Sequence, residues 1–270
     1  MKFWSGLAVA AAATLLSACN ADMDFNTSSS GVPLSELDYQ GAKPTEIALA
    51  GPDRVIVTSG DSLTINVEGD AEVTKDLRFD LDGDSLEIGR EGNWRKSGVA
   101  TIRITMPTPT EVTLAGSGTI EIDQLGTGGD AEVSIAGSGE SKIAKVDAAE
   151  LEVNVAGSGS LKAAGRAKTL ELSIAGSGDL DLRQLDVGDA DISIAGSGDA
   201  VFASNGKVEA SIMGSGKVEV IGNATCTVSA MGSGELKCSA RTAAADDKDA
   251  EAPSDQASGS YGEADSTDTQ

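Results

Sequence analysis

Acidic residues at a repeated spacing are the groups in this 270-residue chain most able to bind a ligand. Six of them stand five positions before successive Gly-Ser-Gly tripeptides, and they are Glu111, Glu132, Glu152, Glu171, Asp191 and Glu209. Carboxylate oxygens are the ligands that divalent cations such as calcium prefer, so this spacing could provide a cation site. The alternative is a solvated face with bases nearby, such as Lys142, Lys162 and Lys168. We favour this alternative, because copying a repeat copies any acid within it.

The composition excludes several kinds of site. The chain has no histidine, which removes Ser-His-Asp catalysis, Cys-His catalysis and every histidine-ligated metal. It has no Cys-x-x-Cys motif, and its Gly-Ser-Gly tripeptides lack the strand-to-helix context of a phosphate-binding loop. The net charge of −23 argues against nucleic acid as a partner, because nucleic-acid binding needs a basic surface. The sequence therefore predicts a protein that is not an enzyme and has no catalytic residue, cofactor or assigned metal ligand.

The Gly-Ser-Gly tripeptides also indicate the fold. They recur at intervals of 18 to 21 residues, beginning at Gly116, Gly137, Gly157, Gly176, Gly196, Gly214 and Gly232. Apolar residues alternate on both sides of each one, with Val112 and Leu114 before the first and Ile120 and Ile122 after it, which is the period of a β-strand. The outward positions repeat as well, so each coil is expected to lie in register on the previous one. The sequence predicts an all-β protein, a parallel β-helix with coils of about 20 residues.

Residues 45–109 are expected to form the first, irregular coils and the N-terminal cap. Their alternation predicts five short strands, at Arg54–Thr58, Ser62–Glu68, Leu77–Leu81, Ser85–Gly89 and Ala100–Met106. The flanking segments have a different composition. Residues 20–44 are predicted to be a disordered tether, and residues 241–270 an acidic disordered tail, because they contain few residues that could be buried.

The first 19 residues resemble the signal peptide of a bacterial lipoprotein. Lys2 precedes an apolar run from Leu7 to Ala18, which is shorter than the roughly 20 residues of a membrane-spanning helix. The stretch Leu16-Ser17-Ala18-Cys19 is similar to a lipobox, which implies that Cys19 is acylated and becomes the new N-terminus. Asn20 then implies sorting to the outer membrane of the bacterial cell envelope. An ordinary signal peptide with an incidental cysteine is the alternative.

The middle of the chain resembles the head GIN domain of putative autotransporter adhesins. The resemblance rests on the run IALAGPDRVIVTSGDSLTINVEG, on IRITMP, and on the serial AGSG motifs, and it covers about residues 45–240. It implies a right-handed β-helix and a place in the bacterial envelope, and it supplies no catalytic motif. The predicted organisation is a signal peptide over 1–19, a tether over 20–44, the β-helix over 45–240 and the tail over 241–270.

Two further features suggest local sites. Cys226 and Cys238 both occupy inward positions of the last coil, and an oxidising envelope would allow a disulfide between them, with two buried free thiols as the alternative. Trp94, Arg95 and Lys96 belong to a segment, beginning at Arg90, that is expected to be exposed. They could recognise an acidic sugar or a protein partner. The alternative, which we favour, is a cap over the first coil or a plain loop.

These observations predict a non-enzymatic lipoprotein that attaches to the membrane through its lipid and presents a β-helical surface for adhesion or scaffold binding. The expected partners are an envelope protein or a polysaccharide. The alternative function is a β-helix protein that binds or cleaves polysaccharide.

Overall fold

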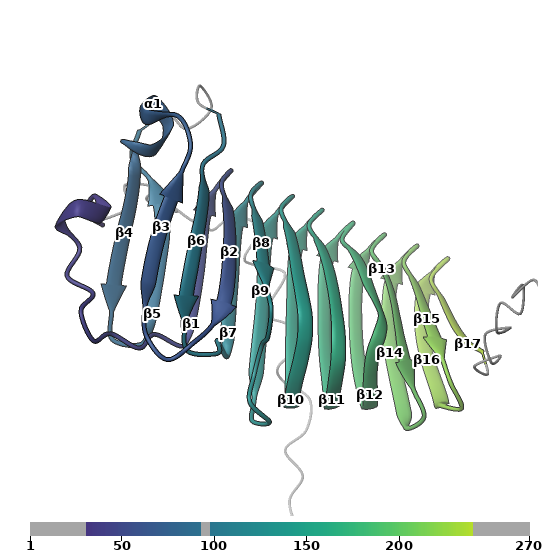
Figure 1. Cartoon of the computed structure of the whole chain (residues 1–270). Helices are drawn as coiled ribbons and strands as arrows, with labels where there is room; N and C mark the ends of the chain where they lie inside the picture. Colours follow the sequence, from purple (N-terminus) through teal and green to yellow (C-terminus); the bar gives the residue numbers. More distant parts are fainter. Residues whose placement is uncertain (1–30, 93–97, 240–270) are drawn as a thin grey trace, which may run out of the picture. The chain divides into compact units, whose positions relative to one another are not determined.

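The computed structural model describes residues 31–92 and 98–239, and most of this part of the chain is β-strand. Successive coils stack side by side, and each coil contributes strands to two main ladders, which are stacks of hydrogen-bonded neighbouring strands (Figure 1). Two short helices, η2 (Leu34–Glu36) and α1 (Ala71–Thr74), lie near the beginning of the described chain. The prediction of a disordered tether is therefore wrong for residues 31–44, because η2 lies there and Leu37 and Tyr39 pack against the core. Within the described ranges, no helix has the length and apolarity needed to cross a bilayer.

The first ladder holds the strands that run into the glycine corners. In spatial order it contains β4 (Leu77–Asp82), β5 (Ser85–Arg90), β1 (Glu46–Gly51), β7 (Glu111–Gly116), β9 (Ala131–Gly137), the second halves of β10 (Glu140–Gly157), β11 (Ser160–Gly176) and β12 (Asp179–Gly196), then β14 (Lys207–Gly214) and β16 (Thr225–Gly232). Every neighbouring pair is parallel except β4 with β5. Equivalent residues face each other, so that Ala115 pairs with Ala136 and Gly116 with Gly137.

The second ladder holds the strands that leave the corners. In spatial order it contains β3 (Thr64–Glu68), β6 (Thr101–Met106), β2 (Arg54–Ser59), β8 (Thr119–Ile122), the first halves of β10, β11 and β12, then β13 (Asp199–Ser204), β15 (Lys217–Ile221) and β17 (Glu235–Ser239). Only β3 with β6 is antiparallel. The stack of parallel, in-register coils is therefore confirmed, and the protein is a β-solenoid. Its right-handed winding stays a prediction of the family resemblance.

Each long strand changes direction once, which adds a short third ladder to the coil. Val146 of β10 pairs with Gly165 of β11, and Gly165 pairs with Leu185 of β12. The pairing register shifts just before this point in each strand, for example between Ile143 and Val146. Such irregularities bend a strand, so the chain can turn back toward the first ladder without a separate loop.

The glycine corners stack through their backbones. In each tripeptide the serine N–H donates to the first glycine carbonyl of the preceding corner, as Ser158 does to Gly137 at 2.8 Å. The first glycine has a positive φ, +120° at Gly157, where side chains are disfavoured. A Cβ atom on Gly157 would also lie 2.5 Å from the Gly137 oxygen. Glycine is therefore required at this position for two reasons: its backbone conformation and the closeness of the neighbouring coil.

The core is a single aliphatic column between the ladders. The inward residues two positions before each corner are fully buried through the first six corners, and they are Leu114, Ile135, Val155, Ile174, Ile194 and Ile212. The last coil differs, because Val228 is 47% exposed and Ala230 is exposed. These two residues are inward by register, but no further coil covers them among the described residues.

The N-terminal segment confirms the five expected strands but arranges them in an unexpected order. β5 and β6 lie outside β1 and β2, so the chain begins inside the stack, runs out to its end and returns. β1 was not among the strands predicted from the sequence. It ends in an additional corner, where Gly51 pairs with Gly116 and Pro52-Asp53 replaces Ser-Gly.

Candidate binding surfaces of the solenoid

The outward side of the first ladder, named here the acidic face, is built from three parallel stripes. One stripe is acidic, because the six repeated acids pair in register with each other and with Glu46 of β1. Glu46 was not among the predicted acids, although it too stands five positions before a corner glycine, Gly51. Small polar residues form the second stripe, and they are Thr113, Ser134, Asn154, Ser173, Ser193, Ser211 and Ser229. Alanines form most of the third, with Met213 and Met231 at its end.

Neighbouring like charges act on the acidic stripe. Burial is the main cause that raises the pKa of Glu111, and the charges of Glu46 and Glu132 on the adjoining strands raise it further. The polar stripe partly offsets this repulsion. The Ser134 hydroxyl donates to the Glu132 carboxylate at 2.9 Å, and the Asn154 amide donates to Glu152 at 2.8 Å.

Two of the three bases expected near this stripe lie elsewhere. Lys142 and Lys162 lie on the second ladder, which faces away from the acidic stripe, so this part of the interpretation is wrong. Lys207 does reach the stripe, with its Nζ 2.7 Å from a Glu209 oxygen. Within residues 31–92 and 98–239, no group of three potential metal ligands lies close enough together to hold an ion.

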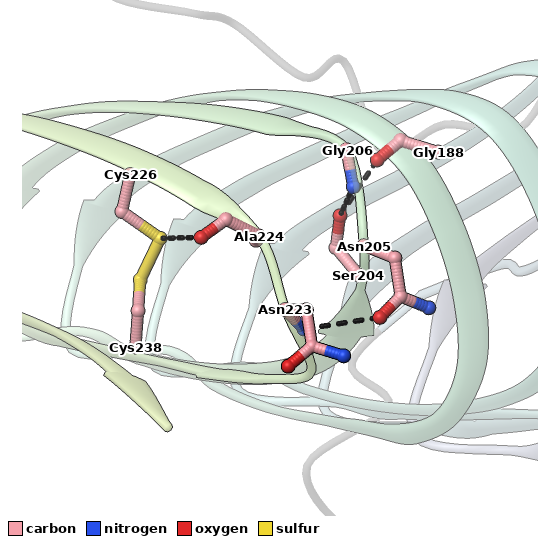
Figure 2. Close-up of a disulfide and its surroundings, with 8 residues drawn as sticks. All are labelled: Gly188, Ser204, Asn205, Gly206, Asn223, Ala224, Cys226 and Cys238. Carbon is pink, nitrogen blue, oxygen red and sulfur yellow. Dashed lines mark hydrogen bonds between the residues drawn. A yellow bond between two sulfur atoms is a disulfide. The ribbon is translucent and has the colours of Figure 1, made fainter. Parts of the chain in front are cut away.

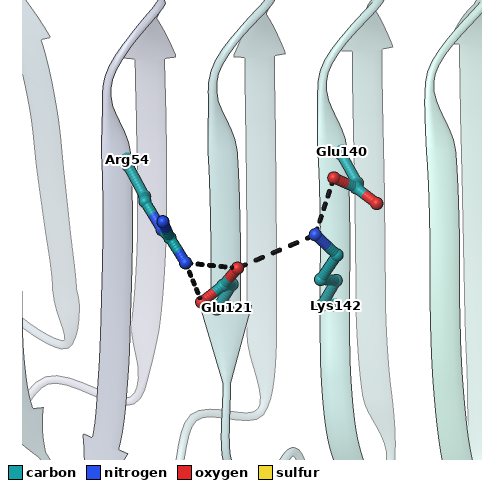
Figure 3. Close-up of polar contacts among 4 residues, drawn as sticks. All are labelled: Arg54, Glu121, Glu140 and Lys142. Carbon is teal, nitrogen blue, oxygen red and sulfur yellow. Dashed lines mark hydrogen bonds and ion pairs between the residues drawn. The ribbon is translucent and has the colours of Figure 1, made fainter. Parts of the chain in front are cut away.

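The outward side of the second ladder carries mixed charge and is hollowed into a groove of about 860 Å³. Arg54 donates two hydrogen bonds to Glu121, at 2.9 and 2.8 Å (Figure 3). Lys142 lies 2.8 Å from Glu140 and 3.7 Å from Glu121, and the hydrogen bond to Glu140 is the main cause that raises the pKa of this lysine. The groove, named here the mixed-charge groove, is lined by Glu121, Lys142 and Lys162 among others.

Local irregularity explains the hollow. The strands shift register where the second ladder meets the third, and small residues, Ala144 and Ala164, lie there. The rim carries charge from Asp181 and Arg183, which pair at 3.3 Å. No sequence pattern indicated this groove, because it depends on where the strands bend relative to one another.

A buried ion pair lies at the additional corner. Arg90 and Asp53 are each 1% exposed, and the Arg90 Nε donates to an Asp53 oxygen at 2.6 Å. The same carboxylate accepts the Ala100 N–H at 2.7 Å, and Arg90 also donates to the Gly98 carbonyl at 2.9 Å. The expectation that Arg90 begins an exposed patch is therefore wrong, because it faces inward to Asp53. Trp94, Arg95 and Lys96 lie outside the described residues, so their role stays a prediction.

The structure joins Cys226 and Cys238 by a disulfide between the two faces of the last coil (Figure 2). Cys226 stacks on Val208, and Cys238 stacks on Val220. The bond therefore stands where the preceding coil has two buried valines. Beside it, the Asn223 N–H donates to the Asn205 side chain at 3.0 Å, which ties the last turn to the one before.

The fold and its surfaces define a β-solenoid with two extended faces of different charge. The chain belongs to the family described as putative auto-transporter adhesin, head GIN domain, whose pattern matches residues 43–224. The fold is shared with a putative adhesin from Bacteroides fragilis, at 19% identity over 73% of this chain and 93% of that one, with a TM-score of 0.65.

Two Parabacteroides structures are also similar. A putative lipid binding protein from Parabacteroides distasonis is 21% identical over 73% of this chain and 93% of its own, with a TM-score of 0.55. A putative adhesin from Parabacteroides merdae is 15% identical over 73% and 92%, with a TM-score of 0.52. At these identities the likeness shows the fold. The comparison with curated proteins gave no match.

Proposed function

We propose that this protein is a non-enzymatic lipoprotein of the bacterial envelope that presents its acidic face to a basic partner surface in adhesion or scaffold binding. The observation that carries the proposal is the in-register stripe of seven acids, from Glu46 to Glu209. Parallel strands place successive acids about 4.8 Å apart, so the face offers a regular array of acceptors. The adhesin description of the family supports the same reading.

The chemical complement of this array is a surface of lysine and arginine side chains on an envelope protein. Charge complementarity steers association and weakens as salt rises. The neighbouring hydroxyl and amide side chains add hydrogen-bonding groups, while the alanine stripe keeps the face low in relief. These features suit broad surface contact better than enclosure of a small molecule.

The test compares two triple variants of the lipidated protein in pull-downs from intact cells. Glu132→Gln, Glu152→Gln and Glu171→Gln remove three charges from the acidic face at nearly constant shape. We expect several-fold weaker capture of the partner, with the loss largest at low salt. Retained capture would contradict the proposal.

The matched control removes three charges from the opposite ladder. It combines Glu140→Gln, Asp181→Asn and Glu219→Gln, which lie on β10, β12 and β15. Capture should stay near the wild-type level. Equal losses in both triple variants would show that total charge matters rather than the acidic face.

Membrane attachment through Cys19 is part of the proposal and lies outside the described residues. Labelled fatty acid should be incorporated into the wild-type protein and not into Cys19→Ser. Fractionation of the labelled cells would then test placement in the outer membrane. Incorporation that survives the substitution would overturn the lipid anchor.

The mixed-charge groove favours a second candidate, an acidic polysaccharide. Lys142, Lys162 and Arg183 line it, and a carboxylated or sulfated sugar chain could contact all three. Binding on a glycan array that is lost in Lys162→Ala, without release of oligosaccharide, would support a binding module. Released oligosaccharide would instead indicate a polysaccharide-cleaving protein.

A further inference from the structure

The edge of the last coil differs chemically from the coils before it. Among the described residues, β16 pairs only with β14 and β17 only with β15, so one backbone edge of each lacks a strand partner there. Natural proteins usually protect such edges with charged residues, proline or bulges. β16 contains no charged residue and no proline, because its sequence is Thr-Cys-Thr-Val-Ser-Ala-Met-Gly. This contrasts with the chain as a whole, whose net charge is −23.

The change occurs at the position of the acidic stripe. Thr227 pairs with Glu209, and therefore stands where the preceding coils carry an acid. Apolar exposure increases in the same strand, because Val228 is 47% and Met231 is 70% exposed. An uncharged, partly apolar edge strand is the surface that another β-strand can extend.

We propose that β16 and β17 pair with the same strands of a second copy, giving a two-fold dimer joined at the C-terminal ends of the two solenoids. Antiparallel pairing places directly opposite side chains on the same face of the sheet. Cys226, Val228 and Ala230 alternate toward the core. In one such register the inward residues of the two copies meet and cover each other's core. Val228 then lies opposite Val228 of the second copy, on the two-fold axis, and Cys226 lies opposite Ala230 of the second copy.

β17 supports the same register independently. When Leu236 lies on the axis, Glu235 of each copy faces Lys237 of the other, which forms two attractive pairs across the junction. The disulfide shows that Cys226 and Cys238 lie across the core from each other, with Cα atoms 6.7 Å apart. Moving two residues toward the corner from each cysteine reaches Val228 and Leu236. A single two-fold axis can therefore pass through both Val228 and Leu236, so β16 and β17 can each pair with their copies at the same time.

The other end of the solenoid has a different closure. Its outermost strands β3 and β4 run antiparallel to their neighbours, and Val32 covers part of β4 through hydrogen bonds of 2.9 and 2.8 Å with Phe79. Pairing at the C-terminal ends alone uses the same surface on both copies, so assembly stops at two. In such a dimer the first ladders join, and the acidic faces of the two copies become continuous.

The chain that follows β17 fits this edge less well than a second copy does. Residues 241–270 contain eight acidic residues, and their sequence has no apolar alternation that could extend the core. A second β16 brings an uncharged strand, and a second β17 brings the complementary charges.

The test measures the polypeptide mass of the full chain in mild detergent by light scattering and sedimentation. We expect two chains for the wild type and one for Thr227→Glu. That substitution restores the acid of earlier coils and should leave the fold intact, which circular dichroism and thermal melting verify. The control Ser193→Glu adds the same charge in β12, away from the edge, and should keep the two-chain mass.

A second pair of variants tests the register. Lys237→Glu places like charges opposite each other across the axis and should give single chains, whereas Lys217→Glu, one coil further in, should leave the dimer. A one-chain mass for the wild type would overturn the proposal. So would a dimer that survives Thr227→Glu or Lys237→Glu, or one that both controls also dissociate.

Discussion

Replacing Asp53 with alanine tests whether the buried ion pair holds the N-terminal coils together. The pair joins the additional corner to the end of β5, and both side chains are 1% exposed. The substitution leaves the Arg90 guanidinium without its counter-charge. It also removes the acceptor for the Ala100 N–H, which lies 2.7 Å from the carboxylate.

The expected cost follows from what remains buried. Breaking a buried ion pair by removing one partner costs about 3–5 kcal/mol, because an uncompensated charge stays in the interior. Among the residues that the structure describes, Arg90 would keep the bond to the Gly98 carbonyl, at 2.9 Å, and its Nη1 already has no partner there. We therefore expect Asp53→Ala to decrease the free energy of unfolding by about 3–5 kcal/mol.

Urea unfolding followed by circular dichroism measures the effect, with two comparisons. Asp53→Leu with Arg90→Met removes both charges and should cost less than Asp53→Ala alone. Glu121→Ala breaks an exposed pair with Arg54 and should cost at most about 1 kcal/mol. If Asp53→Ala cost no more than Glu121→Ala, the buried pair would not hold the coils, and the reasoning would be refuted.

Three further predictions concern the solenoid body. Gly157→Ala should lower the melting temperature by several degrees, because its Cβ would lie 2.5 Å from the Gly137 oxygen, and differential scanning calorimetry measures the shift. Cys226→Ser with Cys238→Ser should cost about 2–4 kcal/mol in urea unfolding, and a mass measurement of alkylated, non-reduced protein should find no free thiol there in the wild type. Glu111→Gln should raise the melting temperature at pH 7 and have less effect as the pH falls toward the ordinary glutamate pKa of 4.5, because a carboxyl whose pKa is raised by folding destabilises the fold when ionised. An unchanged or lower melting temperature at pH 7 would contradict this last expectation.

The repeat made much of the fold predictable from local signals. Alternation identified the inward residues, and Val112 and Leu114 are both fully buried. Equal spacing identified the register, because a one-residue slip would turn every side chain to the opposite face. The corner at Gly51 was not predicted, because its sequence is Gly-Pro-Asp rather than Gly-Ser-Gly.

The candidate surfaces were predicted only in part. The acidic stripe follows from the repeat and was expected, but Lys142 and Lys162, two of the bases expected near it, lie on the second ladder. Lys142 and Glu132 are near in sequence, yet the corner at Gly137 turns the chain between them, so that they stand on different ladders. Sequence distance cannot show which side of a flattened coil a charge faces until the corners and bends are placed.

The sequence by itself determined the coil length, the parallel register, the aliphatic column and the acidic stripe, because each depends on a short pattern copied many times. The tertiary structure alone decided the order of the N-terminal strands, the Asp53–Arg90 pair, the mixed-charge groove and the position of β16 at the edge of the described first ladder. These features depend on which strands meet across long stretches of chain. Alternation permits several such pairings, and packing of the whole solenoid selects one.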